Sequence, residues 1–156
     1  MGKTPVLAAV AGLALPLRSV PDPVFSQGMV GYGAAIDPPP EVVDAIAPVS
    51  GRLLKLLPHA YVIMTAGNIG VLVHLGLDTV GLNRAGFTEH VNEGETVCSG
   101  QVVITYDVPV IVAAGLNPVV SVVVMDEREP QNITVSYAVH AGAGITQSET
   151  LFTVGR

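Results

Sequence analysis

Two of the four histidines in the chain are spaced so that their rings can meet. His59 and His74 flank residues 60–73, where β-branched, apolar runs surround Ala66-Gly67-Asn68. Gly and Asn tolerate the positive φ of a tight turn, so the segment is typical of a β-hairpin. If the turn is centred between Ala66 and Gly67, His59 and His74 are direct partners. Paired side chains share one face with Cβ atoms about 4.5–5.5 Å apart, so we expect adjacent imidazoles.

A carboxylate follows the second histidine closely. Gly76 leaves open space beside His74, and Asp78 comes after a turn-like step that can bring its side chain back towards the ring. Two imidazoles and a carboxylate suit metal binding, general acid–base catalysis or attack by a neutral imidazole on phosphorus or a carbonyl. The chain has no nucleophile-elbow serine, no HExxH motif and no phosphate-binding loop ending in Gly-Lys-Ser/Thr. The residue types alone leave these three chemistries open.

The composition limits the classes of protein to consider. The chain has 156 residues, a length typical of one domain, and we expect a single domain over residues 1–156. Apolar residues make up 49% and charged residues 13%, which excludes a disordered chain. The net charge of -6 argues against nucleic acid as a partner. The single Cys98 allows no internal disulfide and no metal cluster, which favours a cytoplasmic location.

Apolar stretches raise the question of a membrane span. The mean hydropathy is +0.55, and 18 uncharged residues lie between Asp107 and Asp126. Pro109, Gly115, Asn117 and Pro118 interrupt that run, so it favours buried strands over a spanning helix. The first 17 residues imitate a weak signal peptide, but they contain Pro16 and are better explained as a strand pair. We therefore expect no membrane insertion.

Short apolar runs separated by Gly and Pro predict an all-β sandwich or barrel. One short helix is expected at Val108–Ala114, where Pro109 suits the start of a helix. The expected strands are Val6–Val10, Leu13–Leu17, Ala34–Ile36, Asp44–Ile46, Arg52–Leu57, Tyr61–Thr65, Val71–Leu75, Gln101–Tyr106, Val119–Val124, Ile133–Tyr137 and Thr150–Val154.

Two weak internal repeats accompany these strands. Residues 10–17 match residues 49–56, and residues 94–105 match residues 142–153; each segment resembles a turn followed by a strand. If the repeats are real, the fold consists of similar strand units packed face to face.

The segment around His74 resembles a known family. Val71–Val80 is similar to the active-site signature of the glucose-family enzyme IIA domains of the bacterial phosphoenolpyruvate-dependent sugar phosphotransferase system. The resemblance covers roughly residues 6–154. Further segments resemble the family in the same order along the chain: Val20–Gly31, Ala47–Gly51, Pro58–Ala60, Asn83–Phe87 and Val91–Gln101.

This resemblance implies a phosphohistidine carrier without a cofactor or a metal. His74 would accept a phosphoryl group on Nε2 from the phosphohistidine of HPr and pass it to a cysteine of the sugar-specific IIB domain of a IIBC permease. His59 would hold the phosphoryl group and assist its transfer, and Asp78 would give electrostatic support. The implied fold is an antiparallel β-sandwich, or barrel-sandwich hybrid, with at most short helical segments and a shallow, apolar-rimmed site.

Three residues are candidates for partner docking by the same resemblance: Phe25, Met29 and Val30. Ordinary core packing is the alternative for Phe25 and the favoured interpretation for Val30. Two positions depart from the family pattern. Leu57-Pro58 stands where a polar residue commonly precedes the first histidine, and Leu116-Asn117 stands where a Lys-Ser pair often occurs.

Other classes of protein fit less well. A regulatory IIA relative that binds and controls other proteins according to its phosphorylation state is the main alternative. A lipoyl or biotinyl carrier would need a lysine at a hairpin tip, and neither Lys3 nor Lys55 is so placed. A zinc peptidase would need a third ligand and a His-x-His pair, which are not evident. A metal held by His59 and His74 with a partner's carboxylate is conceivable.

Overall fold

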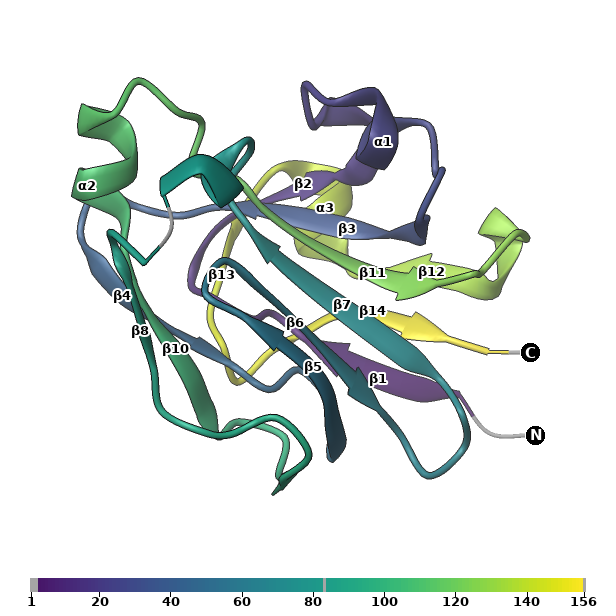
Figure 1. The fold of residues 1–156 in the computed structure, drawn as a ribbon. Coiled ribbons are helices and arrows are strands. Elements are labelled where there is room, and N and C mark those ends of the chain that lie inside the picture. Colours follow the sequence, from purple (N-terminus) through teal and green to yellow (C-terminus); the bar gives the residue numbers. More distant parts are fainter. Residues whose placement is uncertain (1–2, 83, 156) are drawn as a thin grey trace.

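The computed structural model describes residues 3–82 and 84–155. They form an all-β fold in which every strand pairing is antiparallel, as predicted (Figure 1). The strands are β1 (Thr4–Leu7), β2 (Gly12–Pro16), β3 (Gly31–Asp37), β4 (Val42–Ile46), β5 (Gly51–Leu57), β6 (Ala60–Met64), β7 (Gly70–Leu75), β8 (Phe87–Glu89), β9 (Thr96–Val97), β10 (Val102–Asp107), β11 (Val120–Met125), β12 (Ile133–Val135), β13 (Gly144–Ile145) and β14 (Thr150–Val154).

The helices are short. They are α1 (Pro23–Ser26), α2 (Val108–Ala113) and α3 (Tyr137–Ala141), with 3-10 turns η1 (Leu17–Ser19), η2 (Thr79–Leu82) and η3 (Pro130–Asn132). Asp22 caps α1 by accepting a hydrogen bond from the Val24 amide at 3.0 Å, and Pro23 occupies the first turn, where a missing N–H costs nothing. None of the helices within the described residues is long and apolar enough to cross a membrane.

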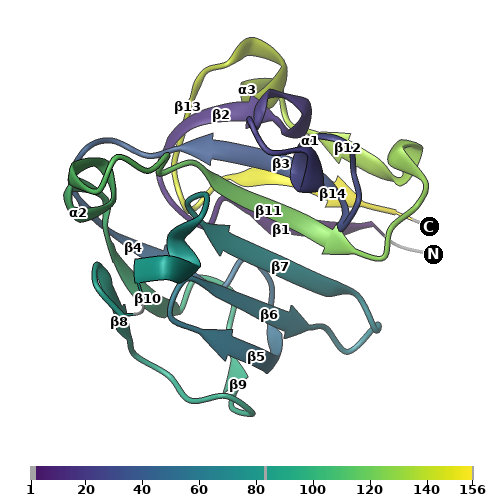
Figure 2. The ribbon, with the colours of Figure 1, turned by 45° about the horizontal axis from the view of Figure 1, so that its top comes forward.

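One large sheet and two small ones build the molecule. The large sheet has the strand order β13-β2-β3-β11-β7-β6-β5-β9, and the small sheets have the orders β1-β14-β12 and β4-β10-β8. The alternation along β11 divides the apolar residues between two clusters. Val120, Val122 and Val124 belong to the main core shared with the small sheets, whereas Val123 belongs to a second cluster with Leu17 and Phe25. The segment with η1 and α1 therefore covers the outer face of the large sheet (Figure 2).

The strand pairings confirm both predicted repeats. Gly12 pairs with Ile145, and its repeat partner Gly51 pairs with Val97, the repeat partner of Ile145. The small sheets agree in the same way. Leu7 pairs with Thr150 beside a bulge in β14, and Ile46 pairs with Val102 beside a bulge in β10. Two similar units, joined along β7 and β11 in the large sheet, therefore make up the fold.

All eleven predicted strands overlap a strand of the structure, and the predicted helix matches α2. The predicted strand Ile133–Tyr137 is too long, because Tyr137 begins α3. The expected pair near the N-terminus exists as two strands, but β1 and β2 belong to different sheets. The sequence did not predict β8, β9, β13, α1 and α3. These elements have only two to five residues, too few to show a hydrophobic period.

Candidate active site

His74 lies on β7 at the centre of the large sheet, close to two other rings. Its imidazole centroid is 5.2 Å from that of His59, and the two rings meet edge to face at 76°. The centroid of the Phe25 ring lies 5.1 Å from that of His74, and the two rings are tilted by 55°. His59 is 8% exposed and His74 is partly buried. The expected meeting of the two histidines is therefore confirmed.

The register of the hairpin is nevertheless one residue away from the prediction. His74 pairs with Ala60 rather than with His59, because the loop between β6 and β7 has five residues, Thr65–Ile69. Asn68 provides the positive φ of this loop, at 62°. In a regular strand a shift of one residue would place His59 on the opposite face. His59 instead belongs to the two-residue turn between β5 and β6, so the alternation of a strand does not fix the direction of its side chain.

A hydrogen bond fixes the chemical state of His74. Nδ1 lies 2.8 Å from the carbonyl oxygen of Gly76, and a carbonyl only accepts, so Nδ1 is protonated and donates. In the neutral ring this leaves the lone pair on Nε2. The Gly76 carbonyl is itself held, because the Gly76 and Leu77 amides donate to the carbonyls of Val119 and Asn117, both at 2.9 Å.

Only glycine fits at position 76. Its φ is +80°, and an added Cβ would approach the Thr79 Cγ2 at 2.6 Å and the Tyr106 hydroxyl at 3.0 Å. Thr79 cannot move away easily, since its hydroxyl donates to the Leu75 carbonyl at 2.7 Å in the buried interior. The open space expected beside His74 is therefore filled, and Gly76 serves instead to turn its carbonyl onto Nδ1.

The electrostatics keep both rings neutral. Burial lowers the pKa of His74 from 6.5, and the charge of a protonated His59 would lower it further. The hydrogen bond to Gly76 and the carboxylates of Asp22 and Asp78 act in the opposite direction but do not reverse the shift. Burial also lowers the pKa of His59. A neutral His74 with a free Nε2 is a nucleophile, and a neutral His59 can donate one hydrogen bond to an anion beside it.

A shallow depression of about 440 Å³ surrounds the two rings. Asp78 lines it in an exposed position with a φ of 59°, so the expected return of its carboxylate towards His74 is found. The lining residues are Asp22, Val24, Phe25, Val30, His59, Leu72, His74, Asp78, Thr79 and Val80.

The three candidate docking residues lie differently. Phe25 is 5% exposed and packs in the second apolar cluster as well as against His74. Val30 packs against the same cluster and also lines the depression. Met29 is 59% exposed and is not among the lining residues. The apolar rim of the depression also includes Val24 and Val80, which are 42% and 66% exposed and which the sequence analysis did not select.

Asp22 is a further residue that sequence reasoning missed. Its carboxylate caps α1 and raises the pKa of His74, although more than fifty positions separate the two residues in the chain. The sequence did contain a signal for the helix cap, namely an Asp followed by Pro. No local pattern could show that this cap lies beside the histidines.

The other two histidines do not line this depression. His90 donates from Nε2 to the Thr105 hydroxyl at 2.6 Å, which in turn donates to Asp44 at 2.8 Å. His140 is exposed on α3. Within the described residues, no three His, Cys, Asp or Glu side chains are grouped so that they could hold a metal ion. Asn83, at the start of one segment of the family resemblance, lies outside the described residues.

Comparison with known proteins agrees with this geometry. Residues 4–129 match the model of the family described as phosphoenolpyruvate-dependent sugar phosphotransferase system, EIIA 1. The glucose-specific EIIA component of Oceanobacillus iheyensis is 36% identical over 136 residues, which are 84% of this chain and 81% of that protein. The glucose-specific EIICBA component of Streptococcus pneumoniae is 42% identical over 112 residues, 70% of this chain but 15% of that longer protein.

A solved structure shares the whole fold. The glucose permease IIA of Mycoplasma capricolum superposes with a TM-score of 0.85 at 28% identity, and the match covers 99% of this chain and 97% of that one. The family model, the relatives and the structure all agree, so the chain belongs to the EIIA 1 family of the phosphoenolpyruvate-dependent sugar phosphotransferase system.

Proposed function

We propose that this chain is a phosphohistidine carrier in which Nε2 of His74 is the phosphoryl acceptor. The observation that supports this most directly is the hydrogen bond from Nδ1 to the Gly76 carbonyl, which leaves the lone pair on Nε2, in a ring that lines the depression. The lowered pKa of His74 keeps that lone pair available near neutral pH. Phosphoryl transfer needs mainly positioning and charge stabilisation around such a nucleophile.

The two half-reactions balance without a cofactor. In the first, the Nε2 lone pair attacks the phosphorus of phospho-HPr, the P–N bond of the donor breaks, and the donor imidazole leaves with the electron pair. In the second, a cysteine thiolate of a IIB domain attacks the same phosphorus, and the P–N bond to His74 breaks. The relatives whose names combine EIIA with IIB and IIC parts, such as the glucosamine-specific EIICBA component of Bacillus subtilis, support a IIB partner.

We assign supporting roles to His59 and Asp78. The His59 ring, 5.2 Å from that of His74, is placed to donate a hydrogen bond to a phosphoryl oxygen without a fixed positive charge that would trap the group. Asp78 raises the proton affinity of His74, and a more basic Nε2 is a better nucleophile towards phosphorus. Phe25, Met29 and Val30, together with Val24, form the proposed docking surface for both partners.

The same proposal includes the extent of the domain, its location in the cell and its relation to the sugar. Residues 1–156 form one enzyme IIA domain, and the carrier works in the cytoplasm, where HPr is found. The site holds a phosphoryl group rather than a sugar, so its residues do not select the sugar. The relatives are named for glucose, glucosamine and mannose, which agrees with one type of carrier serving several permeases.

The decisive experiment is phosphorylation with purified components. The chain is incubated with phosphoenolpyruvate, enzyme I and HPr, and intact mass and peptide mapping then locate any acid-labile, alkali-stable phosphate. We expect one phosphoryl group on His74, none on the His74→Ala variant and normal labelling of the His90→Gln variant. Failure to label the wild-type chain while HPr is shown to be charged would contradict the proposal and favour a purely regulatory role.

A further inference from the structure

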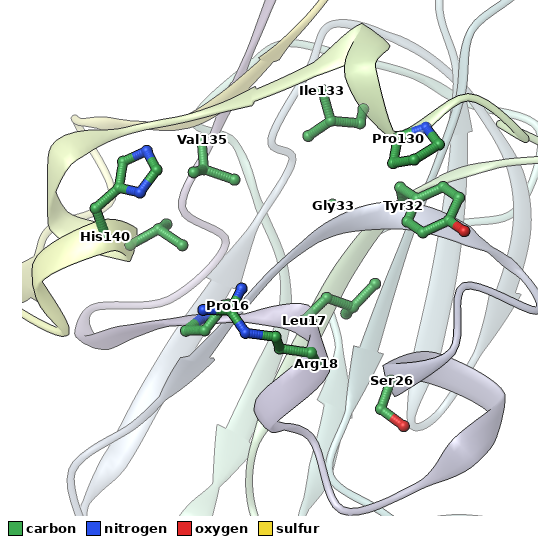
Figure 3. Close-up of a pocket in the computed structure, with 11 residues that line it drawn as sticks. Pro16, Leu17, Arg18, Ser26, Tyr32, Gly33, Pro130, Ile133, Val135 and His140 are labelled. Carbon is green, nitrogen blue, oxygen red and sulfur yellow. The ribbon is translucent and has the colours of Figure 1, made fainter.

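A second pocket lies on the other side of the segment that covers the large sheet. It has a volume of about 300 Å³ and is enclosed by η1, α1, β3, β12 and α3 (Figure 3). Ser26 of α1 lines this pocket, whereas its neighbour Phe25 packs against His74. The two pockets are therefore separated by the same short segment. This volume is at the lower end of the range for small-molecule sites, roughly 300–1,000 Å³.

The described ionisable side chains that line this pocket include basic groups and no carboxylate. Arg18 and His140 line it, and no Asp or Glu is found among its described lining residues. In the view of Figure 3, the Arg18 guanidinium and the His140 ring both lie at the left of the pocket, and Tyr32 and Pro130 lie at the right. Arg18 makes no hydrogen bond or ion pair with the described residues, unlike Arg84 and Arg128, which pair with Glu89 and Asp126.

The remaining lining combines apolar walls with hydroxyl groups. Leu17, Ile133, Val135 and Val139 provide aliphatic surface, and Ser26 with Tyr32 provides two hydroxyls. An unpaired guanidinium presents its donors in a fork that fits the two oxygens of a carboxylate or a phosphate. In a chain with a net charge of -6, a pocket with two basic side chains and no acidic one differs from the general surface.

We propose that this pocket binds a small organic oxyanion, a carboxylate or a phosphate monoester with a compact apolar body. The anionic group lies at Arg18 and His140, and the body packs against the side chains of Leu17 and Val135. Leu17 also belongs to the apolar cluster that contains Phe25, so a bound ligand contacts the segment that presents the active-site rim. This site is independent of phosphoryl transfer at His74 and holds whether or not that transfer occurs.

The test uses three probes that share one ring: phenyl phosphate, benzoate and the neutral benzamide. Each is titrated into the full chain while the methyl signals of Leu17, Val135 and Val139 are followed by NMR. We expect saturable shifts with one or both anions and at least tenfold weaker shifts with benzamide. A preference between phenyl phosphate and benzoate distinguishes the two kinds of anion.

Two variants and one control separate this site from general charge effects. Arg18 is exposed, so Arg18→Gln leaves the fold intact, and we expect it to weaken anion binding about tenfold through loss of the charge-assisted hydrogen bonds. His140→Gln should weaken it less. Arg52→Gln removes an exposed charge on β5 and should change nothing. Equal binding of benzamide and benzoate, unchanged binding by Arg18→Gln, or no methyl shift with either anion would overturn the proposal.

Discussion

The carbonyl oxygen of Gly76 lies 2.8 Å from Nδ1 of His74, and this contact decides which nitrogen of the ring can react. Because Nδ1 is the donor, Nε2 is the free base. The tautomer is therefore set by the backbone two residues further along the chain and does not depend on a partner protein. We expect 15N NMR of the free protein at neutral pH to show His74 with its proton on Nδ1. A proton on Nε2 would contradict this assignment.

The pH dependence of phosphate acceptance follows from the lowered pKa of His74. Because the pKa lies below 6.5, the neutral ring predominates at pH 7 to 8, and the rate should be flat there and fall only at pH values below 6.5. Both His59 and His74 bind protons less readily when folded than when unfolded, so stability should also decrease as the pH falls through about 6.5. Initial phosphorylation rates and urea denaturation across this pH range measure the two effects. A rate that rises towards pH 5.5 would disprove the nucleophile assignment.

Replacing Asp78 should lower the pKa of His74. The carboxylate raises it in the wild type, and Asn keeps both the side-chain shape and the tolerance of a positive φ, here 59°. Asp78→Asn is therefore expected to shift the NMR titration midpoint of His74 to lower pH. Asp126→Asn is a matched control, because Asp126 has a φ of 61° and is not among the groups that shift His74. Equal midpoints in Asp78→Asn and the wild type would show that the carboxylate has no influence.

The His59→Ala variant separates the two half-reactions. We expect it to accept a phosphoryl group from HPr at close to the wild-type rate, since His74 is unchanged. Onward transfer to a IIB domain should slow roughly a hundredfold, the usual cost of removing one donor to a developing charge. Rapid-quench measurement of each step with purified IIB gives both rates. An equal loss in both steps would indicate that His59 only supports the position of His74.

Gly76→Ala tests the turn that holds His74. The positive φ and the contact of an added Cβ with Thr79 at 2.6 Å should together cost about 1–3 kcal/mol of unfolding free energy. They should also disturb the hydrogen bond to Nδ1. Gly115→Ala is the control, since Gly115 has a similar φ of +77° but open space around it. It should cost about 1 kcal/mol or less and leave phosphorylation unchanged. Denaturant unfolding and the phosphorylation assay distinguish the two; equal losses in both variants would mean that close packing at Gly76 is unimportant.

Two substitutions separate docking from packing among the candidate rim residues. Met29 is mostly exposed, so Met29→Ser should leave the unfolding free energy within about 0.5 kcal/mol of wild type and raise the KM for HPr. Phe25 is buried against His74, so Phe25→Ala should raise the KM for HPr and should also lower the unfolding free energy by about 3–5 kcal/mol. Steady-state kinetics measure the KM for HPr, and urea titration measures the unfolding free energy. An unchanged KM in Met29→Ser would remove Met29 from the docking surface.

The short-range features of this molecule could be predicted from the sequence. Short apolar runs separated by Gly and Pro indicated β12 and all the strands with four or more residues, and Pro109 indicated α2. The repeats at residues 12 and 51 predicted equivalent strands, which the pairings with Ile145 and Val97 confirm. Of the strands with two or three residues, only β12 was predicted. The strands β8, β9 and β13 were not, because their pairing with neighbours rather than their own pattern makes them strands.

The nearness of His59 and His74 was predicted for a partly wrong reason. The sequence indicated a hairpin between them, but the length of its loop decides the register, and the five-residue loop pairs His74 with Ala60. The rings meet because His59 lies in the preceding turn. The sequence thus determined the elements and the two chemical groups, since propensity and spacing act locally. Only the tertiary structure decided which ring nitrogen is free, how far burial lowers the pKa, and that Asp22 lies beside His74. These properties depend on atoms brought together from distant positions in the chain.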